Sequence, residues 1–302
     1  MVEFTKPALS LDAQVQLLLT RGMEGEPAKM KRRLGVVSYY RLSGYWFHRK
    51  RADSTFEPGT RFESAWEQYV FDRKLRLLAL DAIERIEVAL RTQFAYEHAN
   101  QFGPFAYATN ARSLPSLTAL QHEKLLTRVR DDVARSKELF VEHFADKYGD
   151  KHQLPPIWMA TEVMSMGSIV TLWQSSPNTV KNRVAATFGV SDSVLRSWLW
   201  SLNEVRNICA HHGRLWNREL GNKPTIPHER HHPDWHKPPM SNRRVFAVLS
   251  VCVHSLARIA PSSAWRQRVM RLVHEHPHIP TTNMGFPTGW EESRLWSTSD
   301  PT

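Results

Sequence analysis

Apolar residues recur every three or four positions along most of the chain, which is the spacing of one face of a helix. The clearest run predicts a helix over about 71–99. Its inner stripe contains Phe71, Leu75, Leu78, Ala82, Ile86, Ala89 and Gln93. Similar patterns, divided by prolines and glycines, predict helices at about 11–22, 27–35, 116–135, 136–148, 156–175, 178–188, 191–216, 243–259 and 263–275. No run of strands is indicated, so the predicted fold class is all-α.

Three stretches lack this pattern. Residues 39–46 are aromatic and interrupted by glycine, so no element is assigned there. The stretch 220–240 is rich in histidine and proline and predicts an irregular loop, and the chain beyond Pro277 has no periodicity. We therefore expect a basic helical segment at 1–60, a helical core at 61–276 that contains the 220–240 loop, and an irregular tail at 277–302.

Charge changes the picture more than composition does. The formal net charge is +10, with 40 Lys and Arg against 30 Asp and Glu, and this excess favours a polyanionic partner such as nucleic acid. Two cysteines are too few for a disulfide framework and lack the paired spacing of a zinc site. The longest apolar run, 245–253, is far shorter than the roughly 20 residues of a membrane span. We expect a soluble cytoplasmic protein with no membrane association.

The helix expected at 191–216 has two distinct faces. One apolar seam contains Trp198, Leu202, Val205, Cys209, His212 and Trp216, which predicts that His212 is a core histidine. Asn203, Asn207 and His211 lie four apart on a polar face, so His211 is the better placed to meet a substrate. On an ideal helix His211 lies about 140° around from Arg206. Their side chains would converge only near a helix end or kink, or across two protomers.

Arg206, Asn207 and His211 match the Arg-x(4–6)-His motif of HEPN ribonucleases in its Arg-Asn-x-x-x-His form. The chain also resembles the Abi family of AbiD/AbiF type, in blocks that fall in order across about 8–260. These blocks are Tyr39–Tyr45, Phe71–Arg76, Ile83–Glu87, Pro155–Trp158 and Arg206–Asn217.

This resemblance implies a HEPN-like helical bundle, with additional N- and C-terminal helices, that acts in abortive infection against phages. It implies a toxin-like endoribonuclease that needs no metal or cofactor, works as a homodimer and cleaves cellular RNA. Some relatives are encoded beside a small noncoding RNA, so a cognate RNA is a further expected partner. Carried over, Arg206 and His211 are the catalytic pair, and Asn207 orients them.

The chemistry of these residue types agrees with that assignment. RNA cleavage without a metal needs one group to take the 2′-hydroxyl proton and a cation to stabilise charge on the phosphate. Histidine titrates near neutrality, and arginine is permanently charged and binds phosphate through two donors. The alternative is that the three side chains only hold helices together.

Weaker candidates have simpler interpretations. Arg214, Tyr40 and Arg41 are candidate RNA contacts, and Tyr39 and Tyr45 also have rings that can stack on bases, although packing in the bundle is favoured for the tyrosines. Glu84, Glu87 and Arg91 either face the active cleft or form a solvated helix face. The histidines of the loop, His228, His231, His232 and His236, favour a solvated loop over a metal site.

Two other functions remain open. A non-catalytic RNA-binding module on the same fold would use the same residues. The stretch from Ala185 to Leu195 resembles a helix-turn-helix, which would make the chain a DNA-binding regulator. Its exposed positions offer one arginine, Arg196, against Asp192, which is little for reading DNA.

Overall fold

The computed structural model describes residues 3, 5 and 7–297, and in this part of the chain every regular element is a helix. The predicted all-α class is confirmed. The α-helices are α1 (Leu11–Thr20), α2 (Pro27–Val36), α3 (Tyr39–Trp46), α4 (Phe62–Phe102), α5 (Ala106–Thr109), α6 (Ala119–Arg135), α7 (Leu139–Tyr148), α8 (Ile157–Val163), α9 (Met166–Ser175), α10 (Asn178–Thr187), α11 (Asp192–Ala210), α12 (Val245–Ile259) and α13 (Trp265–His274). Short 3-10 turns, η1 to η5, lie at Phe47–Arg49, Ala111–Ser113, Pro233–Trp235, Thr281–Met284 and Trp290–Glu292.

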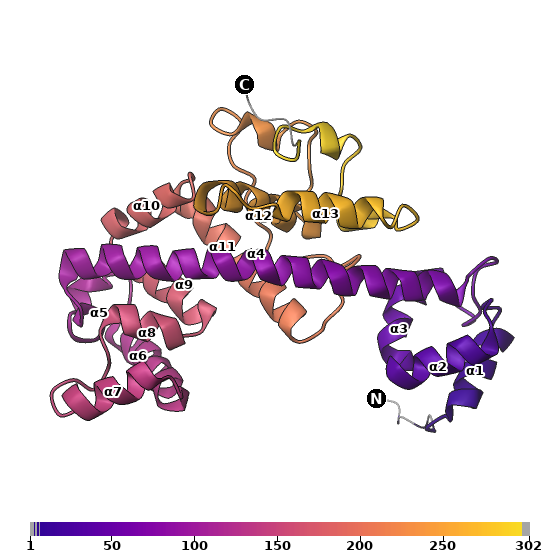
Figure 1. The fold of residues 1–302 in the computed structure, drawn as a ribbon, viewed down its shortest axis with the longest axis horizontal. Helices are drawn as coiled ribbons and strands as arrows, with labels where there is room; N and C mark the ends of the chain where they lie inside the picture. The colour runs from indigo at the N-terminus through magenta and orange to yellow at the C-terminus, as the bar shows by residue number, and fades with distance from the viewer. Residues whose placement is uncertain (1–2, 4, 6, 298–302) are drawn as a thin grey trace. The chain divides into compact units, whose positions relative to one another are not determined.

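The chain divides into two compact units, and α4 contributes residues to both (Figure 1). Unit 1 comprises Met1–Arg76 and Leu272–Ile279. Its core holds a polar cluster in which the Tyr45 hydroxyl donates to the Asp72 carboxylate at 2.6 Å and Arg76 forms an ion pair with the same carboxylate. All three side chains are buried. They belong to two of the sequence blocks that carry the family resemblance, and here their role is to join α3 to α4.

Unit 2 comprises Leu77–Arg271 and Pro280–Thr302, and the C-terminal part of α4 runs through it (Figure 1). Buried side chains along this helix, including Ile83, Ile86, Leu90 and Phe94, form one side of its core. Polar contacts fix its neighbours. At the start of α13, the Trp265 indole donates to the Leu78 carbonyl oxygen at 2.8 Å. On α10, Arg183 forms an ion pair with Glu97 at 3.1 Å.

Several elements differ from their predictions. The helix expected at about 71–99 is longer and forms α4, from Phe62 to Phe102. The unassigned segment 39–46 forms α3, capped by Ser38, whose side chain accepts from the Arg41 amide. The single helix expected at 156–175 is two helices, because the Ser165 hydroxyl accepts from the Ser168 amide and so begins α9. The helix expected at 191–216 ends at Ala210.

The loop at 220–240 and the described part of the tail beyond Pro277 are largely irregular but well packed. In the loop after α11, Trp235 is buried and stacks on Trp198 at 5.3 Å between ring centroids. In the described part of the tail, the Trp296 indole donates to the Ser250 hydroxyl on α12 at 3.0 Å. Burial of large aromatic rings therefore anchors both segments. Among the described residues, no helix is long and apolar enough to cross a membrane.

Candidate active site

The predicted catalytic residues lie at the C-terminal end of α11, in unit 2. The helix ends with a Schellman motif, in which the His212 amide donates to the Cys209 carbonyl oxygen at 3.0 Å and the Gly213 amide donates to Ile208 at 2.7 Å. His212 occupies the left-handed position of this motif, with φ of 56°. The chain therefore leaves the helix one residue after His211.

The prediction that His212 is a core histidine is wrong. The apolar seam from Trp198 to Cys209 is buried as expected, but the helix ends before the pattern reaches His212, which is exposed. Trp216 is buried, yet it lies outside the helix. The apolar spacing in the sequence continues past Ala210, although the helix itself ends there.

Arg206 is held by a charged network that joins α11 to α4. Its guanidinium lies 4.0 Å from the Glu87 carboxylate and donates to the Asn207 side-chain oxygen at 3.3 Å. Glu87 also forms an ion pair with Arg91. Glu87 and Arg91 are both only 8% exposed, so this carboxylate is a buried charge compensated by two arginines.

Arg91 extends the network to α8. It donates to the backbone carbonyl oxygens of Thr161 and Met164, the latter at 2.9 Å, at the point where α8 ends. The last carbonyl groups of a helix have no partner within the helix, and Arg91 supplies one. The interpretation of Glu87 and Arg91 as a solvated helix face is therefore wrong.

A surface hollow of about 600 Å³ opens beside this network. It is lined by Leu80, Asp81, Glu84, Glu87, Val88 and Arg91 of α4, with Arg206 of α11. Asp81 is paired with Arg85 and Arg268, and Glu87 with Arg91 and Arg206. Arg206 is about half-exposed, so its guanidinium is accessible to an anion in the hollow.

The other members of the motif are accessible to solvent. Asn207 and His211 are exposed, and among the described residues no hydrogen bond joins the His211 ring to Arg206. The structure thus brings Arg206 and Asn207 into contact and leaves His211 at the helix end beside them. Arg214 lies beyond the end of α11 and is partly buried.

Tyr40 and Arg41, the weaker RNA-binding candidates, belong to α3 in unit 1. Tyr40 is 89% exposed and Arg41 is also exposed. Their neighbours Tyr39 and Tyr45 pack against other rings, with Tyr39 at 5.5 Å from Trp46 and Tyr45 at 5.9 Å from Tyr69. Packing thus accounts for two of the tyrosines and leaves Tyr40 at the surface.

The histidine-rich loop packs by ring contacts. His232 and Trp235 lie against His254, whose Nε2 donates a hydrogen bond to the Phe188 carbonyl oxygen at 3.0 Å. Burial, with His231 and Arg258 nearby, lowers the pKa of His232. Within the described ranges, no group of three or more His, Cys, Asp or Glu side chains is arranged to hold a metal ion.

The resemblance to a helix-turn-helix has a local basis, because α10 and α11 are joined by a short turn at Gly189, where φ is +68°. However, α11 also packs against α9 and α12. Leu195, Trp198 and Leu199 are buried, and Arg196 is exposed in the first turns of the helix. A helix packed among three others leaves little surface for a DNA groove.

Comparison with known proteins gives one match. Residues 32–217 match the family described as Abi-like protein. No curated protein and no solved structure matches the chain. The matched segment covers more than half of the 302 residues and contains α3, α4 and α11, including Arg206 and His211. The chain therefore belongs to the Abi-like protein family and has a role in abortive infection, a defence against phages.

Proposed function

We propose that this protein is a metal-independent endoribonuclease of HEPN type that cleaves cellular RNA during abortive infection. Arg206 and His211 are its catalytic residues, and Asn207 orients Arg206. The observation that carries the proposal is the placement of Arg206 at an open hollow, held by Glu87 and Asn207, at the same helix end as an exposed histidine.

In this reaction the His211 ring takes the proton of a ribose 2′-hydroxyl, and the 2′-oxygen attacks the adjacent phosphorus. The bond to the 5′-oxygen breaks, and that oxygen takes a proton from solvent water as it leaves. Arg206 stabilises the additional negative charge on the phosphate oxygens through two N–H donors. The products carry a 2′,3′-cyclic phosphate and a 5′-hydroxyl.

The buried Glu87 carboxylate supports this role for Arg206. An arginine on a mobile side chain loses conformational entropy when it binds phosphate, and a carboxylate that already orients it lowers that cost. The net charge of +10 further favours RNA as the polyanion that approaches the hollow.

The first test is cleavage of total bacterial RNA by the purified protein, with and without EDTA. We expect cleavage to be unaffected by EDTA and the products to have cyclic phosphate ends. Cleavage that EDTA abolishes and Mg²⁺ or Mn²⁺ restores would exclude this mechanism.

Alanine variants at the motif test the residue assignments. Arg206→Ala and His211→Ala should each lower the cleavage rate by about 10²–10⁴-fold, while circular dichroism shows a folded protein. The matched controls are Arg196→Ala, at an exposed arginine of the same helix, and His143→Ala, at an exposed histidine of α7. Both controls should keep wild-type activity.

The second candidate is a non-catalytic RNA-binding protein on the same fold. It is favoured by two exposed residues of unit 1, Tyr40, whose ring can stack on a base, and Arg41, which follows it in the sequence. Binding of RNA by the wild-type protein without any cleavage, in the presence or absence of metal, would establish it instead.

A further inference from the structure

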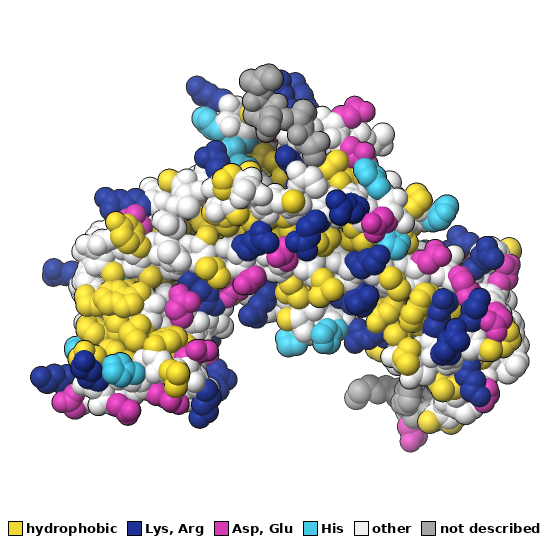
Figure 2. Space-filling view, in the orientation of Figure 1, with side chains coloured by type: hydrophobic (Ala, Val, Ile, Leu, Met, Phe, Trp, Pro, Cys, Tyr) yellow, Lys and Arg dark blue, Asp and Glu magenta, His cyan; other side chains and the backbone are white. Residues whose placement is uncertain are grey.

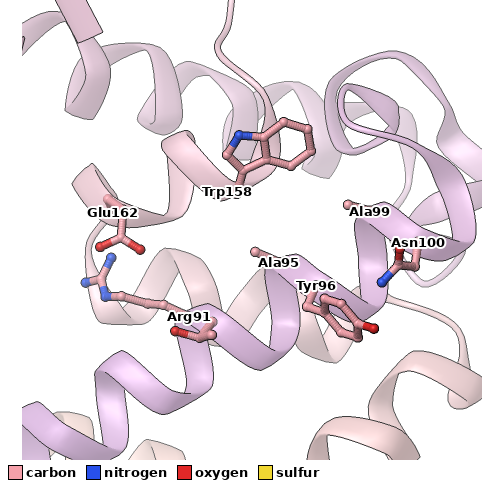
Figure 3. A pocket seen from close by; sticks show the side chains of 8 residues that line it. Arg91, Ala95, Tyr96, Ala99, Asn100, Trp158 and Glu162 are labelled. Carbon is pink, nitrogen blue, oxygen red and sulfur yellow. The ribbon is translucent and has the colours of Figure 1, made fainter. Parts of the chain in front are cut away.

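A second hollow, of about 380 Å³, lies between α4 and α8. Figure 3 shows the Trp158 indole of α8 on one side and the small side chains Ala95 and Ala99 of α4 on the other. Tyr96 and Asn100 lie at one end, and Arg91 and Glu162 lie at the other (Figure 3). A volume in the range of about 300–1,000 Å³ is typical of sites for small ligands.

This hollow exposes aromatic surface that a folded chain usually covers. Trp158 is 50% exposed and Tyr96 is 63% exposed. In Figure 2, hydrophobic side chains gather on the face where Figure 1 places α8 and the nearby end of α4. Contiguous exposed apolar surface marks a binding site more often than isolated apolar residues do.

The polar groups of the rim select the kind of ligand. Asn100 has an amide that both donates and accepts hydrogen bonds, and Glu162 is an exposed carboxylate that accepts them. A carboxylate accepts hydrogen bonds from the N–H groups on the edge of a nucleobase. A flat, uncharged ring with such an edge therefore complements this hollow.

The two hollows share one residue, since Arg91 lines both this site and the hollow that contains Arg206. Arg91 also bonds the end of α8, the helix that carries Trp158. The site for a ring and the site for a phosphate are therefore adjacent on α4.

We propose that the hollow between Trp158 and the Ala95–Ala99 surface binds one nucleobase of single-stranded RNA, next to the phosphate bound at Arg206. Trp158 stacks on the base, the two alanines leave room for it, and Asn100 and Glu162 contact its edge. This base site rests on the proposed function for the position of the phosphate, but binding of RNA at Trp158 does not require that cleavage occur.

Binding is measured with the His211→Ala variant as background, so that cleavage cannot consume the probe. The probe is a fluorescein-labelled, twelve-nucleotide single-stranded RNA of mixed sequence, followed by fluorescence anisotropy. Trp158→Ala should weaken binding by about 5- to 100-fold, because stacking on one base contributes that much. Trp158→Phe, which retains a ring, should keep most of the affinity. Tyr148→Ala, at another exposed aromatic residue, should leave it unchanged.

Three results separate the possibilities. Weaker binding in Trp158→Ala, with no cleavage by the wild-type protein, would support the base site and reject the proposed nuclease. Cleavage by the wild-type protein, with equal RNA affinity in Trp158→Ala, would reject the base site and leave the nuclease standing. If light scattering shows that Trp158→Ala separates a dimer into monomers while RNA affinity is unchanged, the hollow is covered by a second copy and the base site is wrong.

Discussion

His211 and His212 are adjacent in sequence, but their backbones differ. His211 caps α11 with φ of −89°, which any residue adopts, whereas His212 has φ of 56°. A non-glycine residue in the left-handed region is strained, and glycine is the usual occupant of this position in a Schellman motif. The two histidines therefore differ in their tolerance of glycine.

The prediction is that His212→Gly is the more stable of two matched variants. Glycine relieves the left-handed backbone at 212, but at 211 it only adds freedom to the unfolded chain. We expect the free energy of unfolding of His212→Gly to exceed that of His211→Gly by about 1 kcal/mol. Urea unfolding followed by circular dichroism measures both. The opposite order would favour the buried position that the sequence periodicity predicts for His212.

Buried histidines make stability depend on pH. Burial lowers the pKa of His98 to about 4, and burial also lowers that of His254 to about 4. His98 is fully buried, with Phe94 and Phe102 beside its ring. The unfolded chain takes up a proton at these histidines as the pH falls below about 6.5, but the folded chain does so only near 4. Their contribution is therefore present above pH 6.5 and is lost between pH 6.5 and 4.

When the pH falls from 7.5 to 5.0, protonation of His98 in the unfolded chain should lower the free energy of unfolding by about 2 kcal/mol. His98→Phe removes the titrating group, so its loss of stability over this interval should be smaller than that of the wild type by that amount. His143→Phe, at an exposed position, should retain the wild-type pH dependence. Equal pH dependence in all three proteins would show that His98 does not titrate in this way.

At the scale of elements, Arg91 links α4 to the end of α8. Arg91 neutralises Glu87 and bonds the terminal carbonyl groups of α8, all within the buried part of unit 2. Removal of one partner from a buried ion pair leaves an uncompensated charge in a medium that solvates it poorly. Removal of one partner from an ion pair on an exposed helix face lowers the stability much less, because water solvates the remaining charge.

Two arginine variants compare these situations, because their carboxylate partners, Glu87 and Glu97, both lie on α4. Arg91→Ala should lower the free energy of unfolding by about 3–5 kcal/mol. Arg183→Ala removes the partner of Glu97, also on α4, but Arg183 is exposed, so its effect should be below about 1 kcal/mol. Chemical denaturation gives both values. Similar losses in the two variants would mean that the Arg91 network contributes no more than a surface pair.

Most helices follow from apolar spacing, because burial of one face requires it. The spacing fails where capping decides the boundary. Ser165 divides the predicted helix 156–175 through its side-chain hydrogen bond, and the Schellman bonds at Ile208 and Cys209 end α11 early. Both depend on a few local hydrogen bonds that leave the apolar pattern intact.

The motif residues of the candidate site were identified from the sequence, but their surroundings were not. Glu87 and Arg91 stand four apart on α4, a spacing at which helix side chains meet, and they form an ion pair. That spacing is the same in exposed and buried pairs, so it does not reveal that α8 and α11 cover them. The hollow at Trp158 was missed for a similar reason, since an isolated tryptophan in a sequence usually indicates a core position.

At the scale of the whole molecule, we predict that the active species is a homodimer. Arg206 and His211 belong to one helix end but are not joined by a hydrogen bond. Beside Arg206, Val88 is exposed and Leu80 is half-buried. A two-fold interface over this surface would bring the Arg206 of one protomer near the His211 of its partner.

Light scattering should therefore give about twice the chain mass of 35.0 kDa. A mixture of inactive Arg206→Ala and His211→Ala proteins should recover part of the cleavage, because half of the composite sites in mixed dimers combine intact residues. The matched control is a mixture of Arg206→Ala with additional Arg206→Ala, which should remain inactive. A fully active monomer would contradict the prediction.

The double use of Arg91 has a thermodynamic consequence. If an occupant of one hollow changes the position of this guanidinium, it changes the free energy of binding in the other hollow. Linkage then makes the effect reciprocal. A nucleoside bound at Trp158 changes the affinity for phosphate at Arg206 by some factor, and bound phosphate changes the affinity for the nucleoside by the same factor. A free nucleoside and free phosphate would thus act as effectors of each other's binding. For an RNA that fills both hollows, the same coupling energy would be part of its own binding free energy.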